Sequence, residues 1–214
     1  MIGKARPLTS GTTIWLRVAA SCLGLCLSVL PARSQDLAID ALIVDIDQRS
    51  GQYRQLTEIL QGADAARALA AFDVMLETGD KMMRETAIAA AMSATDERLR
   101  ARALWETLLQ KDSVTLVVNT EGLDDDARAA LDSWIGAVST WGITDRISET
   151  QCLNLYGAGE CREDYHLSVS GLKVDMSYRG KIEGGLTLNP EGLLFGEVTN
   201  VTTKAVYPAT IQLR

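Results

Sequence analysis

Few residues in this chain are suited to catalysis by their type and spacing. The sequence holds one histidine, His166, and a nucleophilic triad would need it beside a serine. Ser168 and Ser170 are close to it in the chain, but all three fall on one predicted strand. Side chains two residues apart on a strand run parallel and do not converge. We therefore assign no catalytic residue to this segment.

Metal and cofactor chemistry are equally poorly supported. One histidine and two cysteines that we expect to be bridged are too few for a zinc site. The segment Asp45–Gly51 begins like a calcium loop, but Arg49 stands at the fifth position and the glycine comes one residue late. No glycine-rich phosphate loop is present, and we predict no metal and no cofactor. A site that cleaves glycosides with a pair of carboxylates remains an alternative, because the chain has 28 acidic residues.

A structural prediction can be made for Cys152 and Cys161. We expect them to form a disulfide, since an even pair in an exported chain is typical of a bridge. A redox pair is the alternative, although eight intervening residues differ from the two of a thioredoxin-type site. Between them Tyr156 stands beside glycines, so a loop with a bridged base would present an aromatic side chain. We predict Tyr156 as a partner contact, with an inward-folded tyrosine as the alternative.

The first 34 residues resemble an export signal. Basic residues precede an uncharged apolar run at 18–30, and Ala32-Arg33-Ser34 places small residues at a cleavage position before Gln35. We predict a cleaved signal peptide over residues 1–34 and a periplasmic or secreted location. The run is too short for an ordinary membrane span, so the mature chain should have none, with an uncleaved anchor as the alternative.

Charge excludes further function classes. The formal net charge is −7, and removal of the signal would take away four basic residues and no acidic one. An acidic chain is a poor partner for nucleic acid, whose binding depends on cationic neutralisation of phosphates. We predict no nucleic acid among its partners.

Residues 35–111 are predicted to be helical, because they lack proline and are rich in Ala, Leu, Arg, Glu and Met. Aspartates recur every 16 residues, and apolar residues recur in register with them. The pattern predicts antiparallel helices of about 12–14 residues with aspartate N-caps, in a helical-repeat-like array. An ordinary small bundle is the alternative. The periodic positions are Asp64, Asp80, Asp96 and Asp112, then Phe72, Ile88 and Leu104, then Leu60, Leu76, Met92 and Leu108.

Residues 112–214 are predicted to form a β-rich domain with one helix. A β-branched run at 114–118 favours a buried strand. A helix near 124–140 would carry Trp134 and Trp141 on one face. Alternation of polar and apolar residues after Cys161 predicts an antiparallel meander of four or five strands, with a turn at 189–192.

Together these patterns predict an α+β fold, with an N-terminal antiparallel short-helix array followed by a small antiparallel sheet half carrying one disulfide. We expect an exported, periplasmic, non-enzymatic interaction or accessory protein of the cell envelope, whose main partner is an envelope protein. One alternative is a carrier that holds an apolar small ligand between helices and sheet. Another is a carboxylate-dependent hydrolase of envelope polymers.

Overall fold

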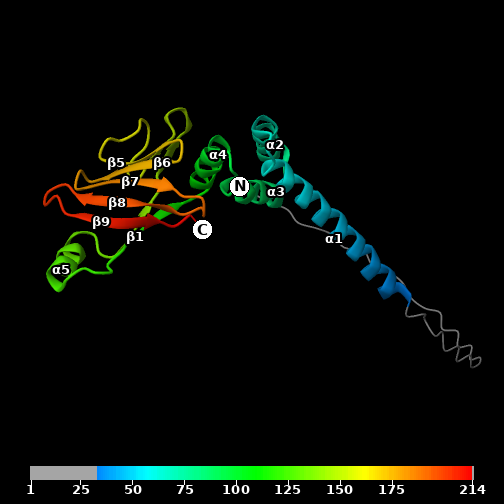
Figure 1. Ribbon diagram of the computed structural model, residues 1–214, viewed down its shortest axis with the longest axis horizontal. Helices are drawn as coiled ribbons and strands as arrows, with labels where there is room; N and C mark the ends of the chain where they lie inside the picture. Colours follow the sequence, from blue (N-terminus) through cyan, green and yellow to red (C-terminus); the bar gives the residue numbers. More distant parts are fainter. Residues whose placement is uncertain (1–32, 214) are drawn as a thin grey trace, which may run out of the picture. The chain divides into compact units, whose positions relative to one another are not determined.

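The computed structural model describes residues 33–213, and it confirms the α+β fold with helices first and an antiparallel sheet second (Figure 1). Residues 1–32, nearly all of the predicted signal peptide, lie outside the described residues. Two units are distinguished, residues 1–43 and 44–214, and helix α1 runs across the boundary between them. Within the described part, no helix combines the length and apolar character needed to cross a membrane.

Four helices precede the sheet, and three of them begin at an aspartate N-cap. They are α1 (Arg33–Leu60), α2 (Ala65–Thr78), α3 (Lys81–Met92) and α4 (Glu97–Leu109). Asp64, Asp80 and Asp96 each accept a hydrogen bond from the backbone N–H three residues on, at 3.0, 2.8 and 3.0 Å. An aspartate there satisfies an otherwise unpaired amide and places negative charge at the positive end of the helix. The predicted N-caps are therefore confirmed for α2, α3 and α4.

The predicted apolar period also corresponds to a core. Phe72, Ile88 and Leu104 are all buried, one on each of α2, α3 and α4, and these helices pack on one another. Two features differ from the prediction. Helix α1 has 28 residues instead of about 12–14, and only its C-terminal part, at Leu56 and Leu60, joins the helical core. Asp112 caps no helix, because the chain enters a strand at the next residue.

All nine strands of the described residues pair antiparallel in one curled sheet. Their order across the sheet is β2-β1-β9-β8-β7-β6-β5-β4-β3, so β1 joins β9 to the edge strand β2. Strands β7, β8 and β9 lie side by side in Figure 1. The meander predicted after Cys161 corresponds to β5–β9, and the strand predicted at 114–118 corresponds to β1, whereas β2, β3 and β4 were not predicted. The bounds are β1 Ser113–Val118, β2 Val138–Gly142, β3 Asp145–Ile147, β4 Cys152–Asn154, β5 Tyr165–Ser170, β6 Lys173–Tyr178, β7 Ile182–Leu188, β8 Leu194–Asn200 and β9 Val206–Ile211.

The two edge strands of this sheet are neighbours in the sequence. Only Ile143 and Thr144 separate β2 from β3, although β2 and β3 stand at opposite ends of the strand order. The Ile143 N–H donates to the Asp112 carbonyl before β1, and the Thr144 N–H donates to the Asn154 carbonyl of β4, each over 2.8 Å. One extended segment thus bridges both ends of the curled sheet.

The helix predicted near 124–140 is shorter than expected. Helix α5 covers Asp125–Trp134, and the Ile135 and Gly136 amides both donate to the Leu131 carbonyl. Gly136 has a φ of +72°, a left-handed conformation that ends a helix and favours glycine. Trp141 consequently lies on β2, and the prediction that Trp134 and Trp141 share a helix face was wrong.

Helix α4 belongs to both hydrophobic cores. Leu99 and Ala103 face the helical core, whereas Leu104, Trp105 and Leu108 pack with the inward side chains of the sheet. The strands alternate inward apolar and outward polar residues, as in β7, where Leu186 and Leu188 are buried. The helical and sheet regions are therefore packed together through α4.

Candidate functional site

The sequence-predicted site residues lie on one short loop, which the structure closes with the predicted disulfide. Cys152 and Cys161 are bonded, with 5.8 Å between their Cα atoms. Cys152 is completely buried on β4, so the bridge fastens the far end of the loop to the sheet. A cross-link of this kind lowers the entropy of the unfolded chain.

Hydrogen bonds hold the same loop at several further points. The side-chain amide of buried Asn154 donates to the Glu160 carbonyl over 3.0 Å and accepts from the Arg162 N–H over 2.9 Å. The Thr144 hydroxyl donates to the Gly157 carbonyl over 2.6 Å. With both its base and its tip bonded, the loop is preorganised, and a partner would lose little entropy by binding it.

Asp145 supplies another support for the loop. Its carboxylate accepts from the Gly159 N–H over 2.7 Å and from the Arg146 N–H over 2.9 Å. These backbone hydrogen bonds, that from Gly159 first, lower the pKa of Asp145 below its ordinary value of 3.8. The carboxylate is therefore ionised at neutral pH and acts as an acceptor for the loop backbone.

Tyr156 stands at the exposed end of this loop. Its side chain is 62% exposed, which excludes the inward-folded alternative for this residue. Its ring lies 5.2 Å from the ring of Tyr165, Tyr165 lies 5.5 Å from Tyr178, and Tyr178 lies 4.9 Å from Trp141. Tyr156 is thus the outermost member of a row of four aromatic rings that reaches from the loop across to β2.

His166 is bound to backbone carbonyls and lines a pocket together with several acidic residues. Its Nδ1 lies 2.8 Å from the Arg162 carbonyl oxygen and 3.0 Å from that of Glu163, so the imidazole is bound to the backbone of the loop before β5. Ser168 faces Cys152 across the β4–β5 pair, in the register of the sheet. These contacts bind His166 to the backbone of the loop before β5 and place Ser168 within the sheet.

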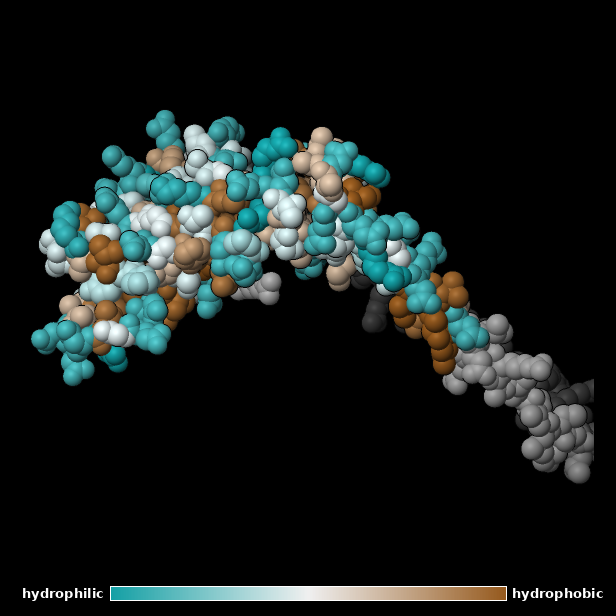
Figure 2. Space-filling view, viewed as in Figure 1, coloured by the Kyte–Doolittle hydropathy of each residue, from teal (hydrophilic) through white to brown (hydrophobic). Residues whose placement is uncertain are grey.

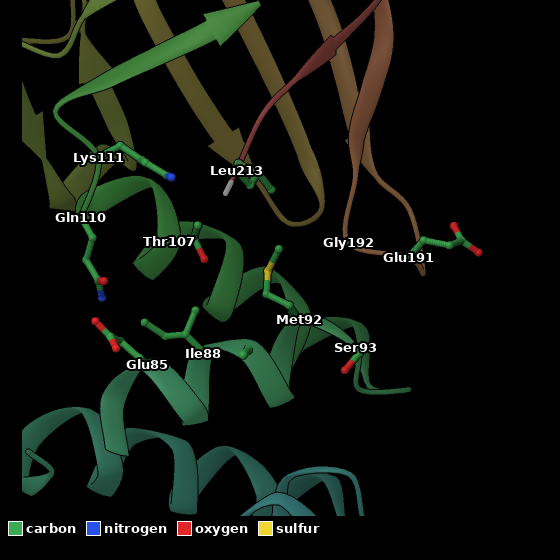
Figure 3. Close-up of a pocket in the computed structure, with 11 residues that line it drawn as sticks. Glu85, Ile88, Met92, Ser93, Thr107, Gln110, Lys111, Glu191, Gly192 and Leu213 are labelled. Carbon is green, nitrogen blue, oxygen red and sulfur yellow. The ribbon is translucent and has the colours of Figure 1, made fainter. Parts of the chain in front are cut away.

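A groove lies between the helices and the sheet, where the carrier alternative placed its ligand without naming residues. It has a volume of about 580 Å³ and runs between α3, the end of α4, the β7–β8 turn and the segment after β9 (Figure 3). Ile88, Met92 and Leu213 form its apolar middle, and its size falls within the range of small-molecule sites. Polar residues stand at its ends and rim: Glu85, Ser93, Thr107, Gln110, Lys111 and Glu191.

Arg100 and Arg146 fix the walls of this groove. Arg100, only 7% exposed, donates to the carbonyls of Leu188 and Asn189 and so attaches α4 to the β7–β8 turn. Arg146 donates to the carbonyl of Leu109 over 2.9 Å and to that of Lys111, and thereby caps the C-terminal end of α4. The backbone that carries Lys111 is consequently held in place.

Helix α1 carries a separate apolar surface. Ile39, Leu42, Ile43 and Ile46 follow the i, i+3, i+4, i+7 spacing of one helix face, and each is 50–57% exposed (Figure 2). Exposed apolar side chains in such a row are typical of contact surfaces. This spacing is visible in the sequence, but it was not recognised because short helices of about 12–14 residues were expected there.

Comparisons with protein-family models, with curated proteins and with solved structures found no match to this chain.

Proposed function

We propose that this chain is an exported interaction protein of the cell envelope, and that the disulfide loop with Tyr156 contacts an envelope protein. The observation that carries the proposal is the combination of a 62% exposed tyrosine with a loop held by a disulfide and by the Asn154 hydrogen bonds. Tyrosine is enriched in the energetically important parts of protein interfaces. A structural tyrosine on a surface loop would not require such extensive support.

Capture of a partner from the envelope fraction tests this proposal. Tyr156→Ala should remove most of the captured protein while it leaves the melting temperature nearly unchanged. Phe195→Ala is the matched control, because Phe195 is another exposed aromatic residue, 49% exposed on β8. Equal capture by the wild type and Tyr156→Ala, or equal loss in both variants, would contradict a role of the loop.

Export is tested separately by the mass of the chain. If residues 1–34 are a cleaved signal peptide, the intact protein extracted from the envelope should begin at Gln35. A mass that retains residues 1–34 would contradict cleavage and favour the anchor.

A second candidate function is a carrier of an apolar small ligand. It is supported by the groove of about 580 Å³ between α3, α4 and the β7–β8 turn, where apolar side chains line the middle. Organic extraction of gently purified protein should then release an apolar compound. The same extract from a variant with a filled groove, Ala89→Trp, should lack it, since Ala89 lines the groove.

A further inference from the structure

We infer that the groove between α3, α4 and the β7–β8 turn binds an anionic amphiphile, with the acidic group at Lys111 and the apolar chain over Ile88 and Met92. This inference deepens the second candidate function and depends on it. The class of ligand is a single apolar chain that ends in a carboxylate or a comparable anion. Its basis is the distribution of charge along the groove.

The cationic end of the groove is defined by Lys111. In Figure 3 its ammonium group extends over the groove from the end of α4, on the side of Thr107 and Leu213. Its side chain is half-buried, and no carboxylate of residues 39–213 lies within ion-pairing distance of it. A partly desolvated ammonium without a partner favours an anionic group on a ligand.

The nearby negative groups do not cancel this charge. Glu85 lies at the same end of the groove, but its carboxylate pairs with Lys81 over 3.8 Å. The C-terminal end of α4 would also repel an anion. Arg146 offsets part of this repulsion, because its guanidinium is bonded to the carbonyls of Leu109 and Lys111, and it also pairs with the neighbouring Asp112 carboxylate over 3.7 Å.

The middle and the opposite end of the groove fix the direction of the ligand. Ile88, Met92 and Leu213 offer an apolar path of side chains between the two ends (Figure 3). At the other end stands the carboxylate of Glu191, on the β7–β8 turn. An anion is repelled there and attracted at Lys111, so the acidic end of the ligand should lie beside α4.

Binding of three probes with the same chain length tests the inference on the full chain. Dodecanoate, dodecanol and dodecylamine are titrated by calorimetry below their aggregation concentrations. We expect dodecanoate to bind most tightly and dodecylamine most weakly. Lys111→Gln should weaken dodecanoate binding about tenfold, as expected for one charge-assisted hydrogen bond, and leave dodecanol binding unchanged. Lys181→Gln, at an exposed position in the β6–β7 turn, should change neither.

Location is tested with a tryptophan that fills the groove. Ala89→Trp should abolish binding of all three probes, whereas Ala66→Trp, on the exposed side of α2, should leave it intact. Binding that survives Ala89→Trp would overturn the placement in this groove.

The outcomes separate this inference from the carrier function itself. If dodecanol and dodecanoate bind equally and Lys111→Gln changes neither, the anionic specificity is overturned and the carrier function stands. If no probe binds to the wild type, both are overturned. The inference is supported if Lys111→Gln loses the preference for dodecanoate while Lys181→Gln keeps it.

Discussion

The guanidinium of Arg100 donates a hydrogen bond over 3.1 Å to the backbone carbonyl of Leu188, 88 residues away in the chain. Arg100 is buried on α4, and its other hydrogen bonds also go to carbonyl oxygens, those of Asn189 and Met92. A buried cation satisfied by carbonyls joins the helical region to the β7–β8 turn and forms one wall of the groove. This contact has a measurable effect on stability.

Arg100→Met should lower the free energy of unfolding by about 2–3 kcal/mol, because buried carbonyls would lose their donor. Urea denaturation followed by circular dichroism measures the change. Arg98→Met serves as the control, since Arg98 lies on the same helix with an exposed side chain, and it should cost less than about 0.5 kcal/mol. A neutral Arg100→Met would show that the contact does not stabilise the fold.

Phe72 and Leu104 occupy equivalent positions in the 16-residue period, and both are fully buried. Truncation of either residue to alanine should lower the free energy of unfolding by about 2–5 kcal/mol, through lost burial and the cavity that remains. Val74→Ala is the control on α2, because Val74 is 56% exposed. Near-neutral values for both positions would contradict the burial of Phe72 in the helical core and of Leu104 in the sheet core.

Replacement of Cys152 and Cys161 by serine should lower the free energy of unfolding by about 2–3 kcal/mol, since the unfolded chain would regain the entropy of the open loop. It should also reduce partner capture, because Tyr156 would no longer stand on a fixed support. Alkylation of the denatured, unreduced protein provides an independent check. Labelling of both thiols would show that the bridge does not form in the protein.

The stability contributed by Asp96 should disappear in acid. Its pKa lies below the ordinary value of 3.8, mainly because the Leu99 N–H donates to the carboxylate. A lowered pKa in the folded state means that the ionised form stabilises the fold above pH 3.8, and that this contribution is lost as the pH falls through the folded pKa. The melting temperature of the wild type should exceed that of Asp96→Asn at pH 7.

This difference should close below pH 3.8, the ordinary pKa of the carboxyl group. The measurement is a series of thermal melts from pH 7 to pH 3. A constant difference at every pH would show that Asp96 acts through its shape and not through its charge.

Local signals explain why much of the fold could be predicted from the sequence. An aspartate cap depends on residues three positions apart, so Asp64, Asp80 and Asp96 marked helix starts correctly. The turn between β7 and β8 was predicted at its position, 189–192, because a turn also depends on neighbouring residues: the Gly192 N–H donates to the Asn189 carbonyl over 3.1 Å.

Features that depend on distant partners could not be predicted in the same way. Strand β4 has three residues and is defined by its pairing with β3 and β5. The groove exists because Lys111 and Leu213, from distant parts of the chain, come together over α3. Gly136 offered a local signal that was overlooked, since its left-handed conformation ends α5 before Trp141.

The position of β9 has a consequence for the order of assembly. This strand, the last in the sequence, lies between β1 and β8, so it alone connects the β1–β2 hairpin to the other strands on that side. A chain that folds from its N-terminal end can form the earlier strand pairs, but it cannot unite the sheet before residues 206–211 are available. Long-range pairing of this kind slows folding. The two parts of the sheet are therefore united only by β9, and the β1 edge that pairs with it stays unpaired until this strand is in place.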